Sequence, residues 1–150
     1  MASWIRAVCA GAAAAVCVSS LALAQASSPV GRWRSSDEKT GQPKSIIEIT
    51  EVNGELRGKV ERVFSPPAPS ENPLCDRCSG DRKSKSVIGM QILWGLKKDG
   101  DEYGGGRILD VETGREIRAK LKLIDGGKKL EVRGFIGVSF AGRTTTWTRE

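Results

Sequence analysis

The fold is decided by one stretch of the chain, Arg115-Glu116-Ile117-Arg118-Ala119-Lys120-Leu121-Lys122-Leu123. From Ile117 onward every second residue is apolar, and the residues between them are basic. A period of two with one apolar face is typical of an antiparallel β-strand that buries one side and exposes the other. After the turn residues Asp125-Gly126-Gly127, positions 128–135 repeat the pattern. The sequence therefore predicts a hairpin whose interior face carries Ile117, Ala119, Leu121, Leu123, Leu130 and Val132.

Short alternating segments of the same kind fill the chain on either side of this hairpin. Asn53-Gly54 separates two of them, and this pair favours a tight type I′ turn because both residues tolerate a positive φ. The expected strands are Gly31–Ser36, Ser45–Val52, Glu55–Phe64, Met90–Lys97, Glu102–Leu109, Arg115–Leu123, Lys128–Phe135 and Arg143–Arg149. About eight short antiparallel strands either close into an up-and-down barrel or split into two packed sheets. Sequential hairpins run almost throughout the chain, which favours the barrel, so we predict an all-β, up-and-down antiparallel barrel.

One connection, residues 65–86 between the third and fourth strands, is much longer than the others. It opens with Ser-Pro-Pro-Ala-Pro and contains Cys75 and Cys78. A loop of this length in a small domain is either functional or disordered. A redox pair would sit at a helix N-terminus, and a zinc site would need two further ligands, so neither use is favoured here. In an oxidising compartment the two thiols would be joined, and we expect a structural disulfide that stiffens the loop.

The N-terminal segment has the features of a cleavable signal peptide. Arg6 supplies the positive charge, residues 7–24 are almost entirely apolar, and small residues at 22, 24 and 26 provide two cleavage sites. A membrane anchor is the alternative, but the run is short and rich in alanine for a span of ~20 residues. We therefore expect cleavage of residues 1–24 or 1–26 and a single domain, residues 27–150, in the periplasm or outside the cell.

Composition argues against most kinds of active site. The chain has no histidine, which removes the usual general base at neutral pH and the commonest metal ligand. The net charge of +6 is spread along alternating strands, which is typical of a solvated sheet face rather than of a nucleic-acid site. Residues 103–107 are rich in glycine but lack the ending of a phosphate-binding loop. Asp110, at a strand end, is expected to fix the turn before Gly114. No catalytic residue, metal site or cofactor is predicted.

Several motifs resemble a known family. They are Gly31-Arg32-Trp33, Asn72-Pro73, the runs 89–96 and 105–110, Gly114, and the runs 130–137 and 142–149. Together they resemble the bacterial domain-of-unknown-function family numbered 2147 over the whole mature chain. The resemblance implies an exported protein with a lipocalin-like β-barrel and implies no activity, because none is established for the family.

The run Gly31-Arg32-Trp33 also resembles the opening signature of lipocalins. In that family the tryptophan plugs the closed end of the barrel, and an arginine from the last strand covers the indole. The resemblance implies that Trp33 is buried at one barrel end with Arg149, or alternatively Arg143, over its ring.

Two functions from different classes remain open. The first is a binding protein that holds a small, partly apolar ligand, because small inward residues such as Gly58, Ala119 and Gly134 would leave room in the barrel. The second is an interaction module with a filled barrel, which would dock on a protein or an acidic envelope component through its basic face and Pro-rich loop. A sizeable apolar cavity favours the first function, and a filled interior favours the second. The residues that would touch a ligand are not identified by the sequence.

Overall fold

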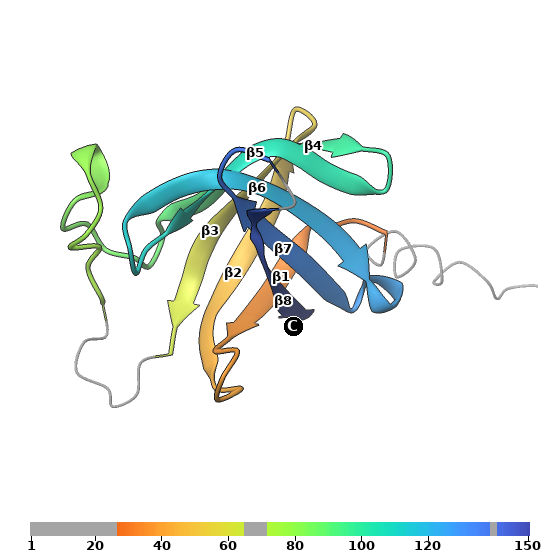
Figure 1. Ribbon diagram of the computed structural model, residues 1–150. Helices are drawn as coiled ribbons and strands as arrows, with labels where there is room; N and C mark the ends of the chain where they lie inside the picture. Colours follow the sequence, from red (N-terminus) through yellow and green to blue (C-terminus); the bar gives the residue numbers. More distant parts are fainter. Residues whose placement is uncertain (1–26, 65–71, 139–140) are drawn as a thin grey trace, which may run out of the picture.

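Eight strands close into one antiparallel barrel in the computed structural model, which describes residues 27–64, 72–138 and 141–150 (Figure 1). Each strand pairs with the next along the chain, and β1 pairs with β8. The strands are β1 (Gly31–Ser36), β2 (Pro43–Val52), β3 (Glu55–Val63), β4 (Gln91–Asp99), β5 (Glu102–Asp110), β6 (Arg115–Ile124), β7 (Lys129–Phe135) and β8 (Arg143–Arg149). The predicted topology is confirmed, and every predicted strand limit lies within two residues of the observed one. The predicted signal peptide lies outside the described residues.

The connections alternate between the two ends of the barrel. We call one end the open end; its connections are residues 37–42, 64–90, 111–114 and 136–142. The other, the closed end, carries the three tight turns after β2, β4 and β6 and the segment before β1. The turn after β2 has φ of 53° at Asn53 and 75° at Gly54, as a type I′ turn requires. The helices of the described residues are single 3₁₀ turns, η1 (Gly80–Arg82) and η2 (Asp125–Gly127), and none is long enough to cross a bilayer.

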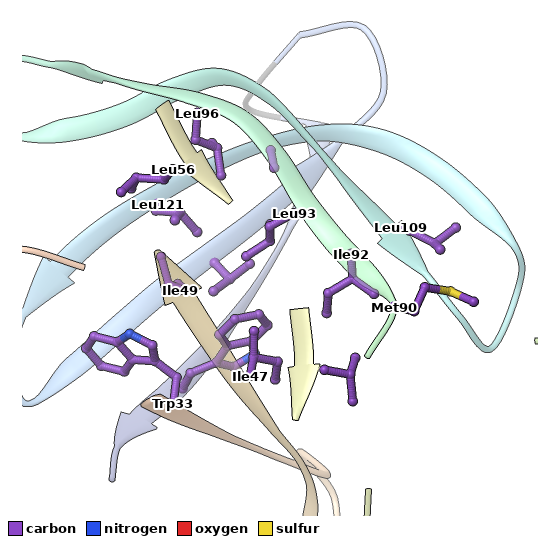
Figure 2. Packing of buried hydrophobic residues seen from close by; sticks show 14 of the residues in the cluster. Trp33, Ile47, Ile49, Leu56, Met90, Ile92, Leu93, Leu96, Leu109 and Leu121 are labelled. Carbon is purple, nitrogen blue, oxygen red and sulfur yellow. The ribbon is translucent and has the colours of Figure 1, made fainter. Parts of the chain in front are cut away.

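Buried apolar side chains pack together in the barrel, and the cluster extends to Met90, Ile92 and Leu109 near the open end (Figure 2). The glycines that were expected to leave room do not. A Cβ on Gly58 would lie 3.0 Å from Leu93 Cδ1, and one on Gly134 would lie 2.6 Å from Ile117 Cδ1. Leu93 and Ile117 therefore occupy the space that the glycines leave. The cluster consists of Trp33, Ile47, Ile49, Leu56, Val60, Cys75, Cys78, Val87, Met90, Ile92, Leu93, Leu96, Leu109, Ala119, Leu121, Leu130, Val132 and Trp147.

Positions 72–90 of the long connection form a folded segment, which we call the cysteine segment. An isolated bridge joins Leu74 to Ser86, and Val87 N–H donates to the Pro73 carbonyl at 2.7 Å. Cys75 and Cys78 are bonded, with 5.4 Å between their Cα atoms, and both are buried in the main core cluster. The pair thus belongs to the core, whereas the sequence predicted only a bond that stiffens the loop. The prolines at 66, 67 and 69 lie outside the described residues.

A glycine explains how the cysteine segment docks on the barrel. Gly114, in the turn between β5 and β6, has φ of 73°, and a Cβ there would lie 1.9 Å from the Arg77 carbonyl oxygen. The backbone of the segment thus approaches the turn more closely than any side chain would permit. On the other side of the segment, Arg82 stacks 4.7 Å above the Trp94 ring and forms an ion pair with Glu116. These contacts hold the segment against β4, β5 and β6.

Candidate functional site

A pocket of about 690 Å³ lies at the open end, where part of its lining belongs to the core cluster. This volume falls within the range of ~300–1,000 Å³ that is usual for small-molecule sites. Four structural parts contribute to its wall: the β1–β2 connection, the ends of β2 to β5, the cysteine segment and the β5–β6 turn. Its apolar lining residues are Pro43, Val60, Val63, Phe64, Pro73, Leu74, Val87, Ile92, Leu109 and Val111.

The polar lining residues come from the β1–β2 connection, the start of β2 and the β5–β6 turn. They are Asp37, Thr40, Gln42, Lys44, Ser45 and Glu112. Lys44 and Glu112 form an ion pair with each other, which joins β2 to the turn between β5 and β6. Ser45 Oγ lies 2.7 Å from Ser35 Oγ. The Thr40 hydroxyl donates to Asp37 Oδ1 at 3.1 Å, so both hydroxyls of the lining already have partners within the protein.

Asp37 is held by its own turn. Its Oδ1 accepts hydrogen bonds from the backbone N–H groups of Thr40 and Lys39, both at 2.9 Å. These bonds favour the charged form, and they lower the pKa of the Asp37 carboxyl. The turn hydrogen bonds of Asp37 and the ion pair between Lys44 and Glu112 thus engage the three charged side chains of the described lining. The pocket therefore suits a ligand with an apolar body and a weakly polar end.

Asp110 takes the structural role expected for it. Its Oδ1 accepts a hydrogen bond from Glu112 N–H at 2.9 Å, and its Oδ2 accepts one from the Thr113 hydroxyl at 2.8 Å. Its carbonyl accepts from Gly114 N–H at 2.7 Å. The side chain thus organises the turn that carries the rim residue Glu112, and it is not free for general acid–base chemistry.

The glycine run in β5 is a site of close strand approach. Gly105 has φ of 76°, and the register between β5 and β6 shifts over this part of the strand. A Cβ on Gly106 would lie 2.4 Å from the Trp94 carbonyl oxygen. These glycines let β5 bend against β4, which is the structural reading expected for them.

Trp33 and Arg149 lie together at the closed end. The Trp33 side chain is fully buried, and its indole N–H donates to the Pro29 carbonyl at 2.7 Å. The Arg149 guanidinium carbon lies 4.2 Å from the centroid of the indole. Arg143, the alternative partner, instead forms an ion pair with Glu38 at the open end. Arg149 is thus the arginine that covers the tryptophan.

Arg149 also ties three backbone segments together. Its Nε donates to the Gly127 carbonyl at 2.8 Å, Nη1 to Val30 at 3.0 Å and Nη2 to Ser28 at 2.8 Å. Gly31 has φ of 133°, and a Cβ there would lie 2.9 Å from Arg149 Nη1. The glycine of the Gly-x-Trp motif therefore makes room for the arginine that covers the tryptophan two residues later.

Sequence reasoning did not find the residues that line the pocket. They are distant along the chain and meet only where connections of the open end converge over the strand ends. One local signal was present: Val63 and Phe64 at the end of β3 and Val111 after β5 are apolar where a turn usually places polar residues. Among the described residues, no group of three His, Cys, Asp or Glu is arranged to hold a metal ion.

An eight-stranded antiparallel barrel that opens with Gly-x-Trp and closes over that tryptophan with an arginine from its last strand has the architecture of a lipocalin-like protein. One solved structure with this fold is protein HP1028 from the human pathogen Helicobacter pylori, which is described as belonging to the lipocalin family. The two structures agree with a TM-score of 0.69 and 18% sequence identity, over 82% of this chain and 83% of that one. An identity this low shows a shared fold and no more.

The family described as "Uncharacterized protein conserved in bacteria (DUF2147)" matches residues 31–149. The chain belongs to this family, as its motifs indicated. No curated protein matches the chain.

Proposed function

We propose that this chain is an exported binding protein that takes up a small, partly apolar ligand in the open-end pocket. One observation carries the proposal: a pocket of about 690 Å³, lined mainly by apolar side chains, at the end of a barrel that is otherwise packed. Burying an apolar ligand in such a pocket removes apolar surface from water, which contributes about 25 cal/mol for each Å².

The position of the polar groups bears on the kind of ligand. Thr40 and Gln42 lie on the β1–β2 connection, and Ser45 lies at the start of β2. Hydrogen-bonding groups at one side of an apolar pocket fix a ligand's orientation. A molecule with an apolar body and a hydroxyl, ester or amide group is therefore favoured over a fully charged one.

Export is part of this proposal. The charged residue, apolar run and small-residue cleavage sites of residues 1–26 support secretion into the periplasm or beyond. Mass spectrometry of the protein recovered from the periplasm tests this directly. The mature chain should begin after Ala24 or Ala26, and recovery of the full-length chain only in the cytoplasm would contradict export.

Dye binding tests the pocket. The protein purified after expression of the full chain is titrated with N-phenylnaphthylamine, a neutral dye that fluoresces when it leaves water. Val63 lines the pocket, so Val63→Trp should weaken dye binding by about tenfold or more, because an indole there occupies the ligand's volume. Val52 is 41% exposed beside the turn after β2, at the opposite end, so Val52→Trp is the matched control and should bind as the unmodified protein does.

Two results would contradict a ligand-binding role. One is the absence of saturable dye binding by the unmodified protein. The other is an equal loss of dye affinity in the Val63→Trp and Val52→Trp variants. Either would favour the alternative function, an interaction module that takes no small ligand. If the dye binds as expected, mass spectrometry of the small molecules that co-purify with the periplasmic protein would identify the natural ligand.

A further inference from the structure

Strands β5, β6 and β7 are neighbours in the barrel (Figure 1). Their register brings four basic residues together on the outer face of these strands. We call this group the basic patch; it consists of Arg107, Arg118, Lys120 and Arg133. In the register of the sheet, Arg107 faces Arg118, and Lys120 faces Arg133. Like charges directly opposite one another destabilise a sheet. Two such pairs side by side are a stability cost that an anionic partner would offset.

In the part of the chain that the structure describes, two members of the patch, Lys120 and Arg133, have polar partners of their own. Lys120 Nζ lies 3.5 Å from Glu102, and Arg133 donates to the Thr144 hydroxyl at 2.8 Å. Within the described residues, no acidic side chain forms an ion pair with Arg107 or Arg118, and both arginines are exposed. The Arg107 guanidinium, and the Arg118 N–H groups other than the one that donates to the Gly137 carbonyl, can thus bind phosphate or carboxylate oxygens.

Exposed aliphatic side chains lie beside the patch. The connection after β7 carries Ile136, 68% exposed, and Val138, 53% exposed, which are the two most exposed of the large hydrophobic residues among those described. We call these two residues the apolar tip. Arg118 Nη1 donates to the Gly137 carbonyl between them at 3.4 Å, which ties the tip to the patch. The surface thus combines protruding apolar groups with cations set back on a sheet.

We propose that this surface docks on membranes that contain anionic phospholipids, with the apolar tip in the interface and the basic patch on the lipid phosphates. Apolar side chains that enter the headgroup region together with a cluster of Lys and Arg are the combination that binds peripheral proteins to such membranes. A nucleic acid or another soluble polyanion would engage the arginines but would leave Ile136 and Val138 in water.

The topology relates this surface to the pocket. The connection after β7 lies at the open end, as do the connections that form the pocket wall, and the Arg143–Glu38 ion pair joins the start of β8 to the β1–β2 connection. A protein docked in this way would hold the end that carries its pocket toward the lipid. The docking surface shares no residue with the pocket lining, so the proposal does not depend on ligand binding.

Co-sedimentation with vesicles tests the proposal. The protein purified after expression of the full chain should sediment with phosphatidylcholine vesicles that contain phosphatidylglycerol, and not with phosphatidylcholine alone. Two double variants, Arg107→Ser with Arg118→Ser and Ile136→Ser with Val138→Ser, should each lower the partition coefficient by about tenfold or more. High salt should weaken binding of the unmodified protein, because the phosphate contacts are screened.

Matched controls carry the same chemical changes elsewhere on the barrel. Arg57→Ser with Lys59→Ser removes two exposed cations from β3, and Val52→Ser removes an exposed valine from the closed end. Both should partition as the unmodified protein does, as should the pocket variant Val63→Trp. All variants share the same N-terminal residues, so the differences between them report on the barrel surface alone.

Three outcomes would overturn the proposal. The first is that the unmodified protein does not sediment with the anionic vesicles. The second is that the partition coefficient falls equally in the Arg107→Ser, Arg118→Ser variant and its β3 control. The third is that the protein binds heparin but not the vesicles. The last result would make the partner a soluble polyanion.

Discussion

Arg149 should contribute more to the stability of the barrel than any surface cation, and replacing it by alanine tests this. Its guanidinium lies 4.2 Å above the Trp33 ring and donates to the carbonyls of Gly127, Val30 and Ser28. Arg149→Ala removes the contact with the indole and leaves all three carbonyls without this donor. It therefore loosens the segment before β1, the turn after β6 and the end of β8 at the same time.

The size of the effect follows from the surroundings of each contact. A cation–π contact contributes ~0.5–2 kcal/mol, and a hydrogen bond to a charged group contributes about 1.5–3 kcal/mol. Val30 is exposed and Ser28 is half-buried, so water replaces most of those two bonds, whereas Gly127 is buried. Burial also lowers the pKa of Arg149, so desolvation offsets part of the gain. We therefore expect a loss of about 3 kcal/mol, which lowers the Tm of a domain of this size by roughly 10 °C.

Urea unfolding followed by circular dichroism measures this loss, with the m-value checked for two-state behaviour. Arg149→Lys should lose most of the same stability, because an ammonium group cannot form the planar fork that reaches three carbonyls. Arg34→Ala is the control, since Arg34 only forms an ion pair with Glu150 at the surface and should cost less than about 1 kcal/mol. An Arg149→Ala loss no larger than that of the control would refute the reasoning.

Three further predictions concern the cysteine segment and the turns. Replacing Cys75 and Cys78 by alanine should preserve the barrel but lower its free energy of unfolding by about 2 kcal/mol. In the unmodified protein, the disulfide should resist reduction by glutathione, with a reduction potential below about −300 mV. Easy reduction by glutathione would contradict a structural role. Gly114→Ala should cost more than about 2 kcal/mol in urea unfolding, because a Cβ there meets a backbone carbonyl, whereas Gly100→Ala, with a similar φ and open space, should cost about 1–2 kcal/mol. Because the pKa of Asp37 is lowered in the folded state, its charged carboxylate stabilises the fold fully above about pH 4 and progressively less as the pH falls through the folded-state pKa. Asp37→Asn should therefore reduce the loss of unfolding free energy on the acid side of the pH profile. An unchanged profile would contradict this.

Much of the fold was predictable because its determinants are local. Alternation of apolar and charged residues from Ile117 to Leu123 reports which side of a strand is buried, and Asn53-Gly54 reports a turn through its own φ values. Neither signal depends on distant parts of the chain. The order of the strands, their antiparallel pairing and the turn role of Asp110 therefore follow from the residues alone.

One strand shows where the local pattern fails. The alternation in β7 predicts that Ile136 is buried and Phe135 exposed, but Phe135 is 8% exposed and Ile136 protrudes. A Cβ on Gly142, in the connection after β7, would lie 2.6 Å from Phe135 Cβ, so the returning chain packs directly against Phe135. The pattern could not register this contact because it comes from residues beyond the strand.

The chain by itself determined the strands, the turns and the motif that places Trp33 at a barrel end. Only the tertiary structure decided that Arg149 rather than Arg143 covers the indole, that Cys75 and Cys78 are buried, and that the free volume lies at the open end rather than beside the glycines. The physical reason is the range of the interactions. The alternation of apolar and charged residues depends only on residues that are close along the chain. Barrel closure and the docking of the cysteine segment bring together residues that are far apart along the chain. Their distances depend on the strand register and on the volumes of the side chains between them.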